Sequence, residues 1–247
     1  MNTAFMLVRT EFRLFFRNFA GVFFVLLFPI FLLLFFGSMF GNDPIQLYNG
    51  HGTIDVDVPV FSCVVLAITG ILLIPWTVTR YRENKILKRY MATPIKPRDI
   101  LASQLAVNLV MAAVGIITLV LAAKIVFDII LPTNIISVVT ALIITAVSIF
   151  SIGLFITSIS SGIRASNVIS LLVYFPMLFL SGAIMPLDTM PDGMAGIGRM
   201  LPFSYGIDLV KGVWFGGNLF DFSTDILILI IVFFVCTTGS LILFRWE

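Results

Sequence analysis

Six apolar stretches without a single charge constrain this chain more than any other feature. None of them contains Lys, Arg, Asp or Glu. Each approaches the roughly 20 apolar residues that a helix needs to cross about 30 Å of hydrocarbon. Hydrophobic residues make up 60% of the chain, whereas soluble domains contain about 45–50%. We therefore expect an all-α integral membrane protein, a single transmembrane domain over residues 1–247. Its six transmembrane helices are expected at residues 19–40, 58–79, 101–123, 135–160, 167–184 and 226–244.

Most basic residues fall on one side of these expected helices. If the six stretches cross a membrane in succession, twelve of the fifteen Lys and Arg residues share that side. Short loops rich in Lys and Arg stay in the cytoplasm, so we expect both termini there. The twelve are Arg9, Arg13, Arg17, Arg80, Arg82, Lys85, Lys88, Arg89, Lys96, Arg98, Arg164 and Arg245. A net charge of +2 gives no reason to expect nucleic acid as a partner.

Residues 1–18 have the pattern of a helix that lies on the inner membrane surface. At 100° per residue, Arg9, Arg13 and Arg17 form one stripe, with a flank of Phe and Val residues beside it. A simple basic topology anchor explains the arginines but does not require the aromatic flank. The apolar run that follows is longer than the roughly 7–15 residues of a cleaved signal peptide, so we expect an uncleaved anchor.

The loop at 80–98, RYRENKILKRYMATPIKPR, is the most informative connection in the chain. Between Arg82 and Ala92, apolar and basic residues recur at helical spacing, which predicts a short amphipathic helix. Pro94 ends this helix because the residue before a proline avoids the α region, and Pro97 opens the third span. Composition alone leaves two interpretations open. The helix either docks on a soluble partner and transmits its motion, or rests on anionic lipid headgroups.

The segment at 185–225 is expected on the outer side. Pro186, Pro191 and Pro202 divide it into pieces too short to span a membrane, which predicts short helices at or partly within the outer interface. They could cap or gate an exit, or form a passive aromatic belt. On the same side, residues 41–57 have the composition of an irregular loop and carry no recognisable site.

The sequence lacks the patterns of several activities. No ionisable residue lies within a span, which disfavours proton coupling through a buried carboxylate, although sodium held by backbone carbonyls would leave no such trace. GxSxG, HExxH and the phosphate-binding GxxxxGK[ST] are absent, so we expect no catalytic residue and no ATPase activity in this chain. The single His51, together with Cys63 and Cys236, has no ligand spacing, so we expect neither a metal nor a cofactor, and thiols that pack as small hydrophobes.

The order of these features resembles a known family, the membrane subunit of type 2 ABC exporters, which includes drug, antibiotic and lipo-oligosaccharide efflux permeases. The likeness covers almost the whole chain. It rests on the basic N-terminal helix, the six spans, the segment RYRENKILKRYMATPIKPRDILASQL and the later segment FLSGAIMPLDTMPDGMAGIGRMLPFSYGIDLVKGVWFGG. The first segment resembles the family's basic loop, and the second its pattern of Gly, Pro and Tyr between spans five and six.

The resemblance implies partners and a docking site. In this family the loop helix is a coupling helix that enters a groove on a separate ATPase subunit, which holds ATP and Mg, and the N-terminal helix lies alongside it. Two permeases pair around the pathway, as two copies of one chain or as related chains. The docking residues implied here are Arg82, Glu83, Ile86, Leu87 and Met91. The interfacial helix carries Arg9, Arg13 and Arg17.

We therefore expect the permease subunit of an ATP-driven exporter in the plasma membrane of a bacterial or archaeal cell. It would move a hydrophobic or amphiphilic compound, such as a drug, an antibiotic, a lipid or a lipid-linked glycan, outward by alternating access. One alternative is a membrane scaffold, immunity or sensor subunit that transports nothing. A second is a carrier driven by an ion gradient. The sequence does not identify substrate-binding residues.

Overall fold

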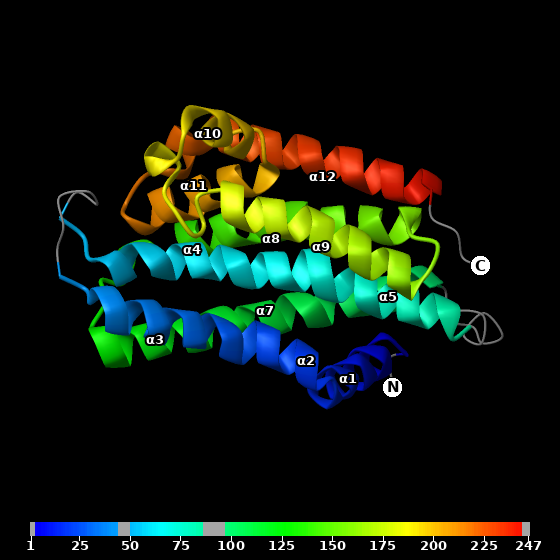
Figure 1. Cartoon of the computed structure of the whole chain (residues 1–247). Coiled ribbons are helices and arrows are strands. Elements are labelled where there is room, and N and C mark those ends of the chain that lie inside the picture. The colour runs from blue at the N-terminus through cyan, green and yellow to red at the C-terminus, as the bar shows by residue number, and fades with distance from the viewer. Residues whose placement is uncertain (1–2, 44–49, 86–96, 244–247) are drawn as a thin grey trace.

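The computed structural model describes residues 3–43, 50–85 and 97–243 as a bundle of helices (Figure 1). Among these residues, six helical stretches are long and apolar enough to cross a membrane. The predicted all-α architecture with six spans is therefore confirmed. The stretches are Phe23–Phe40, Thr53–Glu83, Ala102–Phe127, Ile135–Ile159, Ile163–Leu180 and Leu219–Leu243.

The N-terminal part consists of a short helix followed by the first span. Helix α1 (Thr3–Arg17) ends in arginine and packs against α7 (Pro97–Phe127). The first span then runs through α2 (Phe19–Val22), the π-helical segment η1 (Phe23–Leu27) and α3 (Phe28–Phe40). The position of α1 at a membrane surface stays a prediction.

The second span is the central helix of the bundle. It comprises α4 (Thr53–Ala67), the π-helical segment η3 (Ile68–Leu73) and α5 (Ile74–Glu83). All of its most apolar window is buried by the other helices of the same chain. Its 31 residues span about 46 Å at 1.5 Å per residue, which exceeds the roughly 30 Å of a hydrocarbon core. The helix is therefore longer than the apolar layer is thick.

The central helix begins earlier than expected, which corrects the prediction of an irregular loop up to residue 57. Residues 53–57 are the first turns of α4. The Asp55 carboxylate accepts a hydrogen bond from the backbone N–H of Gly52 (3.1 Å) and so satisfies a donor at the helix N-terminus. A negative charge is also favourable there because of the helix dipole. The apolar pattern marks the membrane layer, whereas these polar contacts set the helix start.

The first, third, fourth and fifth spans pack on this central helix, and the sixth packs on the fourth span and on α11 (Pro202–Trp214). Pro97 opens α7, as the sequence predicted. Helix α8 (Ile135–Ile159) packs closely on η3, and the space for this contact comes from two glycines. A Cβ atom at Gly153 would overlap the carbonyl group of Gly70, so the two backbones touch directly. The outer spans are α9 (Ile163–Leu180) and α12 (Ser223–Leu243).

The predicted short helices between spans five and six are present. They are η4 (Leu187–Thr189), α10 (Asp192–Gly198) and α11 (Pro202–Trp214), and η5 (Leu219–Phe222) then begins the sixth apolar stretch. Pro191 immediately precedes α10 and Pro202 is the first residue of α11, because proline fixes a φ angle suited to a helix start. Helix α11 contributes to the core between α4, α8 and α12, with Phe203 and Leu209 fully buried.

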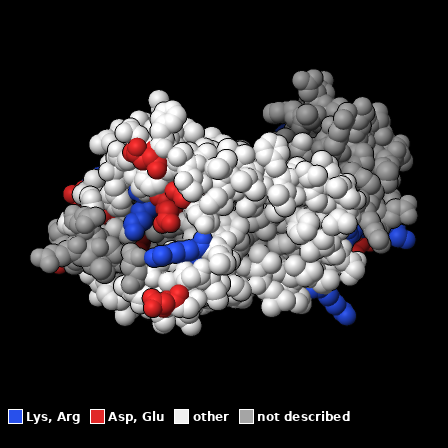
Figure 2. All heavy atoms as spheres, turned by 90° about the horizontal axis from the view of Figure 1, so that it is seen from above, with Lys and Arg blue, Asp and Glu red and all other residues white. Residues whose placement is uncertain are grey.

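Charged side chains gather at the two ends of the molecule, and a broad middle belt of the face in Figure 2 carries none. We call the end with α1, the last turn of α5 and the α8–α9 connection the basic end. The other end, with the start of α4 and helices α10 and α11, is the acidic end. Figure 1 shows that α1 and the last turn of α12 lie at the same end of the bundle.

Candidate functional site at the basic end

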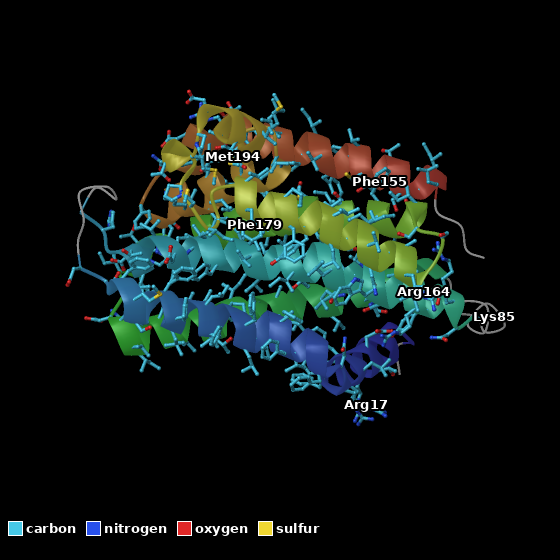
Figure 3. All side chains as sticks on the ribbon, in the orientation of Figure 1. Arg17, Lys85, Phe155, Arg164, Phe179 and Met194 are labelled. Atoms are coloured by element: carbon cyan, nitrogen blue, oxygen red, sulfur yellow. The ribbon has the colours of Figure 1, made fainter. Side chains whose placement is uncertain are left out.

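Three consecutive residues at the end of α5, Tyr81, Arg82 and Glu83, each contact a different neighbouring segment. We call them the 81–83 junction. Tyr81 is buried, Arg82 is half-buried and Glu83 is exposed. They are the last three residues of α5 and fall at the start of the loop at 80–98, which the sequence predicts to hold the coupling helix. Figure 3 labels Lys85 and Arg164 at this end of the bundle.

Tyr81 connects the junction to the N-terminal helix. Its hydroxyl donates to the carboxylate of Glu11, at 2.8 Å from Oε2 and 3.0 Å from Oε1. Glu11 is buried, and this burial raises the pKa of its carboxyl above the ordinary value, while the Tyr81 hydrogen bond lowers it in part. At 100° per residue, Glu11 lies on the side of α1 opposite Arg9. The helix therefore turns its acid toward the bundle and its arginines outward.

Arg82 contacts the end of α8. Its guanidinium donates to the backbone carbonyl of Thr157 (3.4 Å) and to that of Ser160. The last four carbonyls of a helix have no partner within the helix, and they carry the negative end of the helix dipole. A cation in this position supplies donors and favourable charge together.

Glu83 contacts the start of α9. Its Oε1 accepts the backbone N–H of Ile163 at 2.6 Å. The residue that precedes this helix is Gly162, which has no side chain to cap the free N–H groups. Glu83 provides the missing acceptor from another helix, and its negative charge suits the positive end of the α9 dipole.

An open cleft of about 630 Å³ lies beside this contact. Its lining residues are Glu83, Ser161, Gly162, Ile163, Arg164 and Ala165. The cleft combines the carboxylate of Glu83, the guanidinium of Arg164 and backbone groups of the α8–α9 connection, next to the start of the basic loop. Among the described residues, no group of three or more His, Cys, Asp or Glu side chains could hold a metal ion.

The predicted docking residues are only partly described. The polar groups of Arg82 and Glu83 contact the α8–α9 connection, while Ile86, Leu87 and Met91 lie outside the described residues. Their contact with an ATPase stays a prediction. Along α1, the arginines are exposed at positions 9, 13 and 17, and Figure 3 shows Arg17 pointing away from the bundle.

A second polar cluster, missed by the sequence reasoning, joins four segments at the acidic end. The buried Asp55 accepts the backbone N–H of Ile130 at 2.8 Å, in addition to that of Gly52. Its own N–H donates to the side-chain oxygen of Asn42 at 3.1 Å. The indole N–H of Trp214 donates to the carbonyl of Ile130 at 3.3 Å. These contacts fasten the ends of α3, α4, α7 and α11 together.

Comparison with known proteins finds partial sequence similarity to two named bacterial proteins. The chain is 32% identical over 101 residues to nodulation protein J of Rhizobium leguminosarum bv. viciae. The matched stretch covers 40% of this chain and 39% of that protein. It is 25% identical over 157 residues to the inner membrane transport permease YhhJ of Escherichia coli (strain K12), covering 63% of this chain and 41% of the permease. The matched stretches thus span about two fifths of these relatives' own lengths.

The family assignment rests on a longer match. Residues 3–215 match the ABC-2 type transporter family. This range begins with α1 and continues through the 81–83 junction to the end of α11. The six apolar helices agree with a protein that crosses the membrane several times. The chain therefore belongs to the ABC-2 type transporter family and is a multi-pass membrane protein.

Proposed function

We propose that this chain is the permease subunit of an ATP-driven exporter, powered by a separate ABC ATPase. The family match supports this proposal. The observation that carries this proposal is the 81–83 junction. Its hydrogen bonds join the end of α5, where the basic loop begins, to α1, α8 and α9. A soluble subunit that moves this loop would therefore act on several spans at once. The chain contains no phosphate-binding GxxxxGK[ST], so the energy comes from another subunit.

The basic end faces the cytoplasm in this proposal, with both termini on that side. The excess of Lys and Arg at this end supports the orientation through the positive-inside rule. The helix predicted between residues 82 and 92 docks on the ATPase, and the arginine stripe of α1 lies next to it. A second copy or a related permease completes the transport unit, in a bacterial or archaeal plasma membrane.

The substrate in this proposal is a hydrophobic or amphiphilic compound. Charged side chains within a membrane usually mark the path of an ion or a polar substrate. The described spans carry such groups only toward their ends, as with Asp55 and Glu83, and their middle portions are apolar. A compound with a large apolar part can cross beside such helices at a lower cost than a charged one.

A cross-linking experiment tests the proposal. A single cysteine at Leu87, in a Cys63→Ser, Cys236→Ser background, is combined with a thiol cross-linker in native membranes. We expect capture of an ATP-hydrolysing subunit, with a yield that changes when nucleotide is trapped. The matched control is Phe220→Cys, which is 90% exposed at the acidic end and should capture no ATPase. In intact cells, an impermeant thiol reagent should label the control cysteine and spare the one at Leu87.

Three outcomes would contradict the proposal. If the Leu87→Cys probe captures no ATPase and only lipid shields it, the loop is a headgroup anchor. Flux by the purified chain alone, driven by an ion gradient, would instead identify a carrier. An ATPase that is captured but never stimulated by any transported compound would indicate a scaffold or sensor subunit.

A further inference from the structure

We propose that Arg82 and Glu83 are positioning residues that transmit movement of the loop at 84–96 into α8 and α9. This inference rests on the proposed function, because it requires an ATPase that moves the loop. It differs from the docking prediction in one respect. The two side chains act on the permease itself, whichever residues of the loop meet the partner.

The charges of the two residues match the two helix ends that they contact. Helix α8 ends and α9 begins within a three-residue connection, Ser160 to Gly162. The carbonyl end of α8 therefore lies beside the N–H end of α9, and the two dipole ends have opposite signs. Arg82 bonds the first and Glu83 the second. Exchanging the two residues would place each charge against a helix end of its own sign.

The contacts of Arg82 and Glu83 take the place of helix caps, which the residues of the α8–α9 connection supply only in part. Gly162 offers no side chain to α9. The Ser160 hydroxyl donates to the carbonyl of Ile156 at 2.6 Å, which leaves the carbonyls of Thr157 and Ser160 for Arg82. Hydrogen bonds to charged groups are shorter and stronger than neutral ones. The α8–α9 connection is therefore held to the end of α5 by charge-assisted bonds.

The 81–83 junction also lies where a movement of the following loop would first act on the bundle. Helix α5 ends with the junction, at Glu83. Two residues later, Lys85 has a φ angle of 55°, in the left-handed region, so the chain changes direction there. Any displacement of the following loop acts first on the last turn of α5. From there, α8 runs to the acidic end and packs against both α11 and α12. Movement at the basic end thus has a continuous helical route to the opposite end.

The test measures whether the α8–α9 connection responds to nucleotide. A fluorescent amino acid is incorporated at Ser161, in the Cys63→Ser, Cys236→Ser background, and the permease is reconstituted with the ATPase captured at Leu87. Trapping with ATP and vanadate should shift the emission of the parent protein. In Glu83→Gln and Arg82→Met, we expect this response to fall roughly fivefold or more, the usual range of a coupling between two sites. Arg80→Met is the matched control, since Arg80 is a basic residue exposed on the same turn, and its response should persist.

A cross-link separates coupling from folding. A Cβ atom at Gly162 would lie 2.5 Å from Glu83 Oε1, and the extended backbone there (φ −177°) suits any residue. In Glu83→Cys/Gly162→Cys, the response should be lost while the thiols are free and should return when a short cross-linker joins them. A misfolded variant would not recover in this way.

The outcomes distinguish the two proposals. A parent-like response in both Glu83→Gln and Arg82→Met would overturn the positioning role. So would a cross-linked protein that stays unresponsive although its ATPase is bound. If the unmodified chain captures no ATPase at Leu87, the proposed function fails first and this inference fails with it.

Discussion

Replacing Gly153 by alanine should loosen the contact between α8 and the central helix. A Cβ atom at this position would overlap the carbonyl oxygen of Gly70, a backbone atom that cannot rotate away. Because carbon rarely approaches a carbonyl oxygen more closely than about 3.3 Å, the helices would have to separate by more than about 1 Å. Small residues at helix crossings in membranes serve this close approach.

The expected loss of stability follows from two opposing effects. Overpacking costs about 1–3 kcal/mol, and a clash with backbone falls at the upper end of this range. Alanine improves the helix propensity of this position by up to about 1 kcal/mol. We therefore expect a net loss of about 2 kcal/mol, which corresponds to roughly 4–8 °C in Tm for a chain of this size.

Cys63 provides the assay. It is free and fully buried, so a thiol-reactive dye reports unfolding of the detergent-solubilised protein once Cys236 is replaced by serine. Gly70→Ala should cost less, because its Cβ first meets the side chains of Phe150 at 2.8 Å and Ile149 at 2.9 Å, while the backbone oxygen of Ile149 lies farther away, at 3.1 Å. Gly196→Ala is the control, since nothing lies within 4 Å of its Cβ. A Tm for Gly153→Ala at or above that control would refute the close approach.

Three further predictions concern polar groups. Because burial raises the pKa of Glu11 above its ordinary 4.5, attachment of α1 should be strongest below that pH and weaken as pH rises through the raised pKa. Limited proteolysis near Arg17 against pH should show this, and Glu11→Gln should abolish it. Asp55→Ala leaves two backbone donors unpaired and should cost about 3 kcal/mol in the dye assay, with a smaller loss for Asp55→Asn. Lys124 lowers the pKa of Asp128 by a hydrogen bond, so Lys124→Ala should return it toward 3.8, as a carboxyl 13C titration would show.

The local features of the fold were accessible from sequence because they depend on neighbouring residues. Charge-free runs mark the membrane layer, and prolines mark the helix starts at Pro97 and Pro202. The separation of basic and acidic ends also follows from residue order alone. Each of these signals acts within about one helical turn or one span, so a single chain reveals it.

Helix extent was harder to predict than helix existence. Hydropathy detects only the part of a helix that lies in lipid, so the polar first turn of α4, with Asp55, was assigned to a loop. The π-helical segments η1 and η3 also leave no clear sequence signal. The segment η3 accompanies a close backbone contact between Gly70 and Gly153, two residues that are distant along the chain.

The contacts of the candidate site were the least predictable. Glu83 and Arg82 bond to backbone atoms of residues 157–163, and backbone groups are the same in every sequence. Glu11 offered one usable signal, as the single acid opposite the arginine stripe of an otherwise basic helix. Gly162 offered another, because a helix start without a capping side chain needs an acceptor from elsewhere.

The burial of the central helix separates it from the surroundings of the protein. Its most apolar window is enclosed entirely by helices of the same chain, so neither lipid nor a second permease touches it there. A change in bilayer thickness can tilt the outer helices, but it can affect the central helix only through the contacts of those outer helices. Homologous partners could thus be exchanged, or the lipid composition altered, without changing the immediate environment of the helix that joins the two aqueous sides.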